Sequence, residues 1–445
     1  MKNNDTIVAI ATANGIGSIS IIRLSGDDAL QIALGILQKK SLTPRYASLC
    51  KVYSNTQDLI DEALILYFKN PHSFTGEDIV EFQCHGGIAV SNMVVDALVA
   101  SGARLADPGE FSKRAFLNGK IDLTQAEAIA KLIEARSEDS VKLLAKQLNG
   151  DLKDFVENIR KDLLFMLAYT EVNIDYAEED LPADIYEQIQ QKLENISTLL
   201  SSTLESSKRR VGMIEGFKVA IIGKPNVGKS SLLNKLLDYD RAIVSDIAGT
   251  TRDTIEESVK IGTHIIKMVD TAGIRDASDE IEKIGIEKSL DSIQSADIII
   301  ALFDNSQCKD EQDDHVLNLL KDSNKEKIIV LNKSDLDAHF DAGGLYDVIE
   351  LSAKNDIAPL ISKVEKILDN NTHSDDMTLI SKRQVDAVKV ALTQIVQAQT
   401  PLQTGELEFF AHHINEALES ISNITRPYEH TQMLDVMFGS FCLGK

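Results

Sequence analysis

The chain has 445 residues, of which 43% are hydrophobic and 26% charged, and its formal net charge at pH 7 is −23. This length allows for roughly three domains of about 150 residues each, and the composition excludes a chain that is disordered throughout. A protein this acidic does not bind a polyanion through its overall charge and would need a local basic patch or a partner protein.

Two features of the sequence indicate the cellular compartment. The four cysteines are widely separated and include no Cys-x-x-Cys pair, which argues against a disulfide framework or a cysteine zinc site and suits a reducing cytosol. No apolar run approaches the roughly 18 residues of a membrane helix, and the first residues lack the apolar core of a signal peptide. We therefore expect a cytoplasmic protein without a membrane span.

Residues 1–118 are predicted to form an α+β domain. Runs rich in branched and aromatic residues at 19–24 and 63–68 are typical of strands. Helical patterns are found at 27–37 and 91–100, and glycine and proline residues between the elements mark turns.

Residues 119–212 and 375–445 are predicted to be helical and to form one domain that is interrupted in the sequence. In the first part, Thr124 and Glu127 match a capping box, in which the hydroxyl and the carboxylate each accept a hydrogen bond from a backbone amide of the first turn. The acidic run at 175–184 is interpreted as a solvated connection between two helices.

The inserted segment, residues 213–374, alternates short apolar strands with amphipathic helices. The strands are expected at 218–222, 264–269, 297–303, 327–331 and 348–351. This alternation is typical of a parallel α/β sheet. The predicted fold class is therefore multidomain, with an α+β N-terminal domain, a discontinuous α-helical domain and an inserted α/β domain.

The start of the inserted domain matches the eight-residue P-loop pattern with Gly223-Lys224-Pro225-Asn226-Val227-Gly228-Lys229-Ser230. The pattern lies between a predicted strand and a predicted helix, where glycines allow backbone amides to point at phosphate oxygens and the helix N-terminus adds positive potential. Lys229 is expected to contact the β- and γ-phosphates, and Ser230 to bind magnesium. This placement disfavours the alternative of a glycine-rich turn without a ligand.

Three further motifs follow predicted strands, and they are Asp270-Thr271-Ala272-Gly273, Asn332-Lys333-Ser334-Asp335 and Ser352-Ala353-Lys354. Asp270 can hold magnesium through water, and the Gly273 amide can face the γ-phosphate. Asp335 can accept hydrogen bonds from two donors of guanine, whereas adenine would leave this acceptor unpaired. The nucleotide is therefore predicted to be GTP. In an ATPase, which is the alternative, the motif Asn332-Lys333-Ser334-Asp335 would have no function. The third motif can close over the base oxygen.

The residue after Gly273 is Ile274, at the position where Ras-like enzymes place a glutamine that orients the attacking water. An isoleucine cannot orient water, so catalysis must come from another residue. Glu282 is a candidate for positioning the water, and a solvated helix charge is the alternative. Arg252 and Arg275 could act as arginine fingers or could be surface charges.

Motifs along essentially the whole chain carry a family resemblance. They are Ile22-Arg23-Leu24-Ser25-Gly26; Ser73-Phe74-Thr75-Gly76-Glu77-Asp78 with Glu81 and His85-Gly86-Gly87; Pro108-Gly109-Glu110-Phe111-Ser112 with Arg114-Ala115-Phe116-Leu117-Asn118; Leu123-Thr124-Gln125-Ala126-Glu127-Ala128; Asp246-Ile247-Ala248-Gly249-Thr250-Thr251-Arg252-Asp253; and Phe441-Cys442-Leu443-Gly444-Lys445. The chain resembles the MnmE (TrmE) family of tRNA-modification GTPases. The last motif best distinguishes this family from other GTPases, since ribosome-assembly GTPases share the GTPase motifs. Leu443 in this motif is a conservative replacement of the family's usual isoleucine.

The resemblance implies a homodimer whose N-terminal domain binds 5-formyl- or methylene-tetrahydrofolate, together with a helical domain and an inserted G domain. It implies a heterotetramer with the flavoprotein MnmG (GidA), which supplies FAD, and the addition of a carboxymethylaminomethyl-type group to carbon 5 of the tRNA wobble uridine. It also implies that potassium stimulates GTP hydrolysis when two G domains meet face to face.

The resemblance also implies roles for single residues. These are Arg23, Glu81, Lys120 and Lys445 for folate; Asn226, Ser245, Ile247 and Thr250 for potassium; Ser230 and Thr251 for magnesium; Glu282 for positioning water; and Cys442 as a functionally important cysteine. Basic groups could meet the carboxylates or ring carbonyl of folate, and a carboxylate could accept from the pterin. As single residues, the charged groups could instead be surface charges and Cys442 a buried apolar cysteine.

The motifs and the resemblance together predict a set of GTP-binding residues. They are Asn226, Val227, Gly228, Lys229, Ser230, Ser231, Ser245, Asp246, Ile247, Ala248, Gly249, Thr250, Thr251, Asp270, Thr271, Ala272, Gly273, Asn332, Lys333, Asp335, Ser352, Ala353 and Lys354.

Two other classes of function compete with this interpretation. A GTP-switched ribosome-assembly factor would carry a basic RNA-binding module, such as a KH domain with its Gly-x-x-Gly loop. The negative net charge and the lack of such a module in the sequence argue against it. A scaffold GTPase with weak hydrolysis would not need the folate-type residues or Cys442.

Overall fold

The computed structural model describes residues 5–13, 15–135, 137–175, 183–239, 258–269, 293–321, 323, 325–370 and 377–426, together with 434, 437–439, 441 and 444. The chain divides into two compact units. The first comprises residues 1–133, 146–189 and 393–445, and the second comprises residues 134–145 and 190–392.

A mixed sheet with the strand order β3-β4-β5-β2-β1-β6 organises the start of the first unit. Its strands are β1 Ile7–Ile10, β2 Ile19–Ser25, β3 Ser48–Tyr53, β4 Leu59–Phe68, β5 Ile79–His85 and β6 Arg104–Leu105. Neighbouring strands are antiparallel except for the short parallel pair of β1 and β6. The strands predicted at 19–24 and 63–68 are confirmed as parts of β2 and β4.

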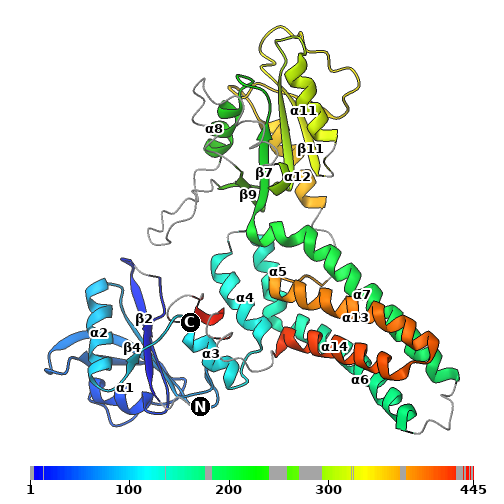
Figure 1. The fold of residues 1–445 in the computed structure, drawn as a ribbon. Helices are drawn as coiled ribbons and strands as arrows, with labels where there is room; N and C mark the ends of the chain where they lie inside the picture. Colours follow the sequence, from blue (N-terminus) through cyan, green and yellow to red (C-terminus); the bar gives the residue numbers. More distant parts are fainter. Residues whose placement is uncertain are drawn as a thin grey trace. The chain divides into compact units, whose positions relative to one another are not determined.

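One face of this sheet is covered and the other is more open. Helices α1 Ala29–Leu37 and α2 Ile88–Ala100 share a core with the covered face, which confirms the two predicted helices (Figure 1). Along β2, Ile22 and Leu24 are buried, whereas Ile21 and Arg23, which point to the other face, are only half-buried. The open face therefore carries Arg23 of β2 and its neighbour Glu81 of β5 beside apolar side chains such as Ile21.

Helices follow the sheet along the chain and also form the part after the inserted domain. Their bounds are α3 Glu110–Leu117, α4 Leu123–Glu134, α5 Glu138–Asn149, α6 Asp151–Asp175, α7 Ala183–Glu215, α13 Lys382–Thr404 and α14 Leu407–Thr425. Within the first unit α14 packs along α6 (Figure 1). Long amphipathic helices of this kind are stabilised by packing of their apolar faces rather than by local propensity.

The capping box of α4 lies two residues earlier than predicted. Gln125 donates its backbone amide to Asp122 Oδ1 at 3.0 Å, and Asp122 donates its backbone amide to Gln125 Oε1 at 3.0 Å. The hydroxyl of Thr124 donates to Asp122 at 2.6 Å and does not cap the helix at the predicted position. The prediction was wrong because an aspartate just upstream is an equally good N-cap residue.

The second unit contains a sheet with the order β12-β11-β10-β7-β9-β8. Its strands are β7 Phe217–Ile222, β8 Ser258–Ile261, β9 His264–Met268, β10 Ile298–Asp304, β11 Glu326–Asn332 and β12 Val348–Glu350. All neighbours are parallel except the antiparallel pair of β8 and β9. The five strands predicted here are confirmed, and β8 was not predicted.

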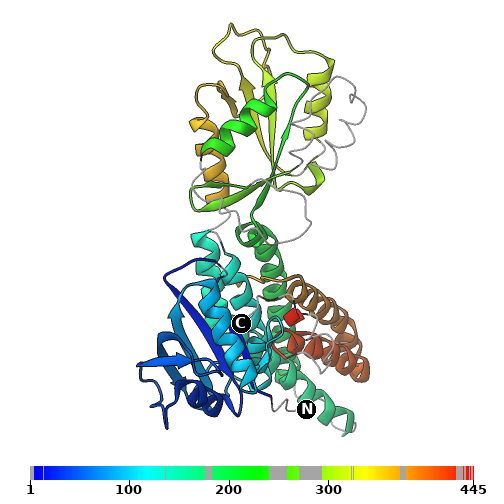
Figure 2. The same cartoon turned by 90° about the vertical axis from the view of Figure 1, so that its left-hand side faces the viewer.

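Helices cover both faces of this second sheet. Helices α8 Lys229–Tyr239 and α12 Ala358–Asn370 contribute to the core on one face, and α11 Glu311–Lys321 contributes to the core on the other (Figure 2). The two faces divide β7 by alternation, since Val219 belongs to the first core and Ala220 to the second. This arrangement confirms the predicted α/β fold of the inserted domain.

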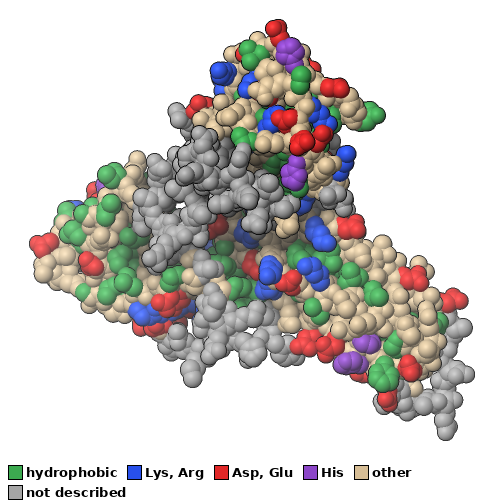
Figure 3. Space-filling view, turned by 45° about the horizontal axis from the view of Figure 1, so that its top comes forward, with side chains coloured by type: hydrophobic (Ala, Val, Ile, Leu, Met, Phe, Trp, Pro, Cys, Tyr) green, Lys and Arg blue, Asp and Glu red, His purple; other side chains and the backbone are tan. Residues whose placement is uncertain are grey.

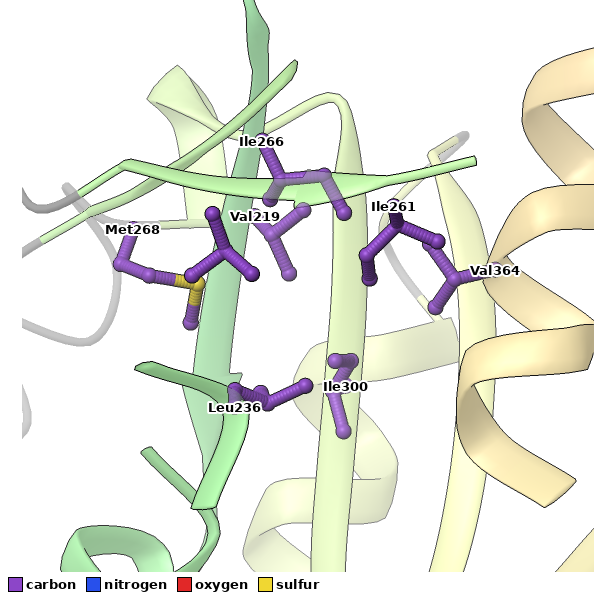
Figure 4. A pocket seen from close by; sticks show the side chains of 8 residues that line it. Val219, Leu236, Ile261, Ile266, Met268, Ile300 and Val364 are labelled. Carbon is purple, nitrogen blue, oxygen red and sulfur yellow. The ribbon is translucent and has the colours of Figure 1, made fainter. Parts of the chain in front are cut away.

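The interior of this domain holds a small apolar pocket. All eight residues that line it are hydrophobic, and they are Val219, Leu236, Val259, Ile261, Ile266, Met268, Ile300 and Val364 (Figure 4). Such a lining has no donor for a phosphate and no ligand for a metal ion, so the pocket is part of the core and is not a nucleotide site. Over the described part of the chain, no helix is sufficiently long and apolar to cross a membrane.

Candidate functional site

The loop that joins β7 to α8 has a backbone that depends on glycine. Gly223 has a φ of +154° and Gly228 a φ of +104°. A Cβ atom on Gly223 would lie 2.4 Å from the Leu302 carbonyl oxygen, and one on Gly228 would lie 2.2 Å from the side-chain nitrogen of Asn332. Both positions therefore exclude larger residues, and the loop leads directly into the N-terminus of α8, where free amide donors favour an anion.

Lys229, the first residue of α8, reaches back across this loop. Its ammonium group donates to the carbonyl oxygens of Gly223 at 2.7 Å and Lys224 at 2.9 Å. Burial lowers the pKa of the Lys229 side chain below its usual value. A partly desolvated cation beside the loop amides is the arrangement that binds phosphate in P-loop proteins.

Asn332 joins three of the predicted motifs. Its side-chain nitrogen donates to the Val227 carbonyl oxygen at 2.7 Å, and its side-chain oxygen accepts from the Ala353 amide at 2.9 Å. Asn332 is buried, so both hydrogen bonds are shielded from water. The end of β11 thus holds together the phosphate loop and the Ser352-Ala353-Lys354 segment.

The remaining residues of the second motif present charged groups at the same edge of the sheet. Asp335 is exposed, and its pKa is lowered by the hydroxyl of Ser352, by its own backbone amide and by the positive charges of Lys354 and Lys333. Its carboxylate is therefore ionised at neutral pH and can accept two hydrogen bonds. A carboxylate in this position suits the predicted reading of guanine.

The Lys333 side chain is held by a partner that the sequence analysis missed. Its ammonium group lies 2.5 Å from Asp304 Oδ2 at the end of β10. Burial raises the pKa of Asp304, but the hydrogen bonds from Lys333 and Ser306 outweigh it, so this pKa lies below its usual value. The signal in the sequence was an aspartate at the end of a fully apolar strand.

A second missed partner belongs to the phosphate loop. Lys224 forms ion pairs with Asp310 and Asp313, each at 2.7 Å, at the start of α11. The sequence pattern that could have revealed it is the Asp-x-x-Asp spacing, which is typical of a helix N-terminus.

In the first unit, the predicted residues Arg23 and Glu81 lie opposite each other on β2 and β5. Arg23 Nε donates to Glu81 Oε1 at 2.9 Å, and the guanidinium group lies 5.7 Å from the ring centre of Phe74 and 5.9 Å from that of Phe111. Both side chains are partly exposed, at 21% and 14%. The pair therefore offers an acid and a base between two aromatic rings on the open face of the sheet.

The predicted residue Lys120 lies beside the loop that carries Phe74. Its ammonium group donates to the Pro71 carbonyl oxygen at 2.7 Å, and a Cβ atom on Gly76 would lie 3.2 Å from its aliphatic chain. The structure thus brings Lys120 to the same loop that contacts Arg23, although the two basic groups have different partners.

The C-terminal motif also meets this region through Gly444. This glycine has a φ of +91°, and a Cβ atom on it would lie 2.3 Å from the carbonyl oxygen of Ile10, whose strand β1 is paired with β2. Farther upstream, a Cβ atom on Gly109 would lie 2.2 Å from the carbonyl oxygen of Phe438. The end of the chain therefore packs backbone against backbone with β1 and with the turn before α3.

A partly buried charge network explains other residues of the family motifs. Arg114 pairs with Asp5 at 2.8 Å and with Glu110 at 3.0 Å, and Arg104 pairs with Glu110 at 2.7 Å. Burial raises the pKa of Glu110, but the hydrogen bonds from Arg104, the Asp107 amide and Arg114 outweigh it and lower the pKa. These residues hold α3 against the start of the sheet.

The other predicted site residues lie outside the described residues. They are Ser245, Asp246, Ile247, Ala248, Gly249, Thr250, Thr251, Arg252, Asp270, Thr271, Ala272, Gly273, Ile274, Arg275, Glu282, Cys442 and Lys445. Their roles stay predictions, as do the domain limits.

The glycine-dependent loop, the buried lysine beside it and the exposed Asp335 define the inserted domain as that of a P-loop GTPase. The family model "GTP-binding protein TrmE N-terminus" matches residues 6–120, and the model "MnmE helical domain" matches residues 123–442. The chain belongs to the MnmE (TrmE) family of tRNA modification GTPases.

Curated relatives are similar to this chain along their whole length. The "tRNA modification GTPase MnmE" of Aliarcobacter butzleri is 69% identical, and the match covers 100% of both chains. The protein of the same name from Sulfurimonas denitrificans is 59% identical, again with 100% of both covered. A solved structure of Era in complex with MgGDPNP and 16S ribosomal RNA is 28% identical over 40% of this chain and 66% of that chain, with a TM-score of 0.26. That score is low, so the family assignment rests on the family models and the sequence relatives.

Proposed function

We propose that this GTPase acts with the flavoprotein MnmG to add a carboxymethylaminomethyl-type group to carbon 5 of the tRNA wobble uridine. Membership of the family supports the proposal and favours it over a role in ribosome assembly. The observation that carries it is the pairing of Arg23 with Glu81 between Phe74 and Phe111, with Gly444 of the terminal motif packed against the neighbouring strand.

These residues fit a reduced folate. The Glu81 carboxylate can accept from the amino and ring donors of a pterin, and Arg23 can donate to a ring carbonyl or a carboxylate. The Phe74 and Phe111 rings can pack against a flat heterocycle, and Lys120 and Lys445 would meet the carboxylates at the other end. When bound, 5-formyl- or methylene-tetrahydrofolate supplies the one-carbon unit, and the partner protein supplies FAD.

For the nucleotide, the chain's own residues bind and orient the phosphates. The loop amides and Lys229 hold the β- and γ-phosphates, Ser230 and Thr251 bind magnesium, and Glu282 positions the attacking water. Oxygen atoms of Asn226, Ser245, Ile247 and Thr250 would hold potassium, which would supply positive charge against the negative charge that develops on the transferred phosphoryl group. This mechanism needs no glutamine at the position of Ile274.

The open face of the N-terminal sheet suits a homodimer. Leu49 and Leu64 are opposite each other on β3 and β4 and are 60% and 43% exposed, and Ile19 on β2 is 60% exposed. Apolar side chains gathered on one exposed sheet face indicate a protein–protein contact. A second copy of the chain is the partner that the family resemblance implies.

Binding of the negatively charged tRNA requires positive charge on the protein surface, and this acidic chain could offer it only in local patches. On the face drawn in Figure 3, acidic and basic side chains of the described residues are interspersed. This distribution agrees with the net charge of −23. We propose that the complex with MnmG, rather than this chain alone, provides most of the contact with tRNA in the cytoplasm.

Mass spectrometry of tRNA wobble nucleosides tests the proposal. Cells that lack this protein are expected to lose the C5-substituted wobble uridine and to regain it with the parent gene but not with Arg23→Ala or Glu81→Gln. The matched control is Lys51→Met or Glu62→Gln, because these oppositely charged residues lie opposite each other on β3 and β4 of the same sheet. Unchanged nucleosides in the deletion strain would refute the modification reaction.

Hydrolysis measurements test the potassium site separately. GTP turnover by the full-length protein is expected to rise with potassium and not with sodium, whose smaller radius does not match the cage of oxygen ligands. Equal rates in the two salts would remove the cation from the mechanism and make Arg252 and Arg275 the candidates for stabilising the phosphoryl charge.

A further inference from the structure

Lys224, the second residue of the phosphate loop, points away from the loop's inner side. Its side chain is 7% exposed, and its ammonium group lies 2.7 Å from an oxygen of Asp310 and 2.7 Å from an oxygen of Asp313. Burial lowers the pKa of Lys224, but the two carboxylates outweigh burial and raise this pKa above its usual value, so the ammonium group stays charged. A lysine placed in this way is not a phosphate ligand.

The two carboxylates also build the N-terminus of α11. Asp310 Oδ1 accepts from the amides of Gln312 and Asp313, each at 3.0 Å, and Asp313 Oδ2 accepts from the Asp310 amide at 3.1 Å. Helix α11 packs on the face of the sheet opposite to α8. Lys224 therefore connects the phosphate loop to a helix on the other side of the sheet.

The charge balance of this contact depends on Lys224. The Asp313 side chain is 1% exposed, and its Oδ1 atom has no hydrogen-bond partner among the described residues. A buried carboxylate with an unsatisfied oxygen is costly unless a cation compensates it. Lys224 is the cation that contacts Asp313, so the loop cannot leave α11 without a large energetic cost.

The same peptide segment carries the acceptors of the phosphate-binding lysine. Lys229 donates to the carbonyl oxygens of Gly223 and of Lys224 itself. Gly223 has a φ of +154°, and a glycine leaves the backbone free to take other conformations. Holding the Lys224 side chain therefore restricts the peptide whose carbonyl groups place Lys229.

We propose that Lys224 is a positioning residue for nucleotide binding. By anchoring the first peptides of the loop to the N-terminus of α11, it holds the Lys229 ammonium and the loop amides in the arrangement that receives the phosphates. Lys224 acts through Lys229 and the loop and does not touch the nucleotide. GDP and GTP share the β-phosphate that the loop amides and Lys229 receive, so the binding of both nucleotides depends on Lys224.

The test uses the full-length protein and fluorescent GDP and GTP analogues. Lys224→Met is expected to lower the affinity for both nucleotides by about tenfold, which is the size of effect seen for residues that act at a distance from a ligand. KM for GTP is expected to rise by a similar factor, with a smaller change in kcat. Lys224→Arg is expected to keep the affinity within about twofold, because a guanidinium group can bridge the two carboxylates.

A triple variant separates positioning from simple stabilisation of the fold. Lys224→Met with Asp310→Asn and Asp313→Asn removes the uncompensated charges, and Asn at 310 still caps α11. The unfolding temperature is expected to recover in this variant while the nucleotide affinity stays low. This comparison keeps the test decisive even where Lys224→Met alone folds poorly.

Lys218→Met is the matched control, because Lys218 is an exposed lysine on the adjacent strand β7. It is expected to change neither affinity nor unfolding temperature. Two results would overturn the proposal. One is a folded Lys224→Met protein with parental nucleotide affinity, and the other is recovery of affinity together with stability in the triple variant.

Discussion

The phosphate loop and the Arg23–Glu81 region are built in opposite ways. The loop is eight consecutive residues, and its glycines, its lysine and the start of α8 lie next to one another in the sequence. The Arg23–Glu81 region combines β2, β5, the Phe74 loop and α3, and a glycine from the C-terminal motif packs on the neighbouring strand. A contiguous motif can be recognised from local chemistry, whereas a dispersed one needs the fold to bring its parts together.

The two regions also differ in what surrounds the key charges. Lys229 rests on neutral backbone carbonyls, so its charge is available to an anionic ligand. Arg23 already has a carboxylate partner, so a ligand there must satisfy both members of the pair. We therefore expect single changes to affect the loop through phosphate binding and the N-terminal region through its internal ion pairs.

The largest expected effect concerns a residue outside both regions, Glu282. If it positions the attacking water, Glu282→Ala should raise the barrier to hydrolysis by roughly 2–4 kcal/mol, as for the loss of one preorganised catalytic group. Nucleotide affinity should change little, because the loop, Lys229 and Asp335 are the groups predicted to bind GTP before hydrolysis. Single-turnover hydrolysis in potassium measures the effect, with Glu287→Ala as the control. A decrease of less than about twofold would leave Glu282 as a solvated helix charge.

The next effect tests how strictly the contiguous loop depends on glycine. Gly228→Ala places a Cβ atom 2.2 Å from the Asn332 side-chain nitrogen at a φ of +104°. Backbone strain and the displacement of Asn332 should together cost about 1–3 kcal/mol of binding free energy. The affinity for GDP and GTP should therefore fall by roughly ten- to a hundredfold. Gly35→Ala is the control, because a Cβ atom on this glycine of α1 would meet no atom within 4 Å. Calorimetric titration that finds parental affinity for Gly228→Ala would contradict the steric argument.

A smaller effect is expected at Asp335, the carboxylate predicted to read guanine. Asp335→Asn replaces an acceptor by a group that can also donate, so GTP should bind about tenfold more weakly and xanthosine triphosphate more tightly. Competition binding with both nucleotides measures the change. Asp337→Asn, two residues farther along the chain, is the control. An unchanged preference for GTP would exclude Asp335 from base recognition.

The smallest effect concerns stability in the N-terminal region. Because the folded-state pKa of Glu110 lies below its ordinary value, its ionisation stabilises the fold above about pH 4.3. This stabilisation is lost as the pH falls through the lower folded-state pKa. Glu110→Gln should therefore cost about 1 kcal/mol near pH 7 and flatten the acid side of the stability profile. Denaturant unfolding between pH 7 and pH 3 measures it.

Asp107→Asn is the control for that experiment. Asp107 also faces Arg104, but its side chain is 84% exposed and the two groups are 3.9 Å apart. Its removal should change the free energy of unfolding by less than about 0.5 kcal/mol at any pH. An equal effect of the two variants would mean that burial does not strengthen the Glu110 ion pairs.

The sequence by itself determined the architecture of the inserted domain and the place of its phosphate loop. Alternation of apolar strands with amphipathic helices predicted the inserted sheet, and the spacing from Gly223 to Ser230 predicted a loop between β7 and α8. These features are local, because the strand and helix periods and the conformational freedom of glycine act over a few residues. The predicted motifs at Asn332 and Ala353 likewise lie at the ends of β11 and β12, where neighbouring parallel strands end at one edge of the sheet.

Only the tertiary structure decided which distant side chains meet. It paired Lys224 with Asp310 and Asp313, and Lys333 with Asp304. Each partner is one of many acidic residues in the chain, and the choice among them depends on strand order and helix packing. These contacts are set by the whole fold because a charge buried within it must find a compensating group wherever the packing places one.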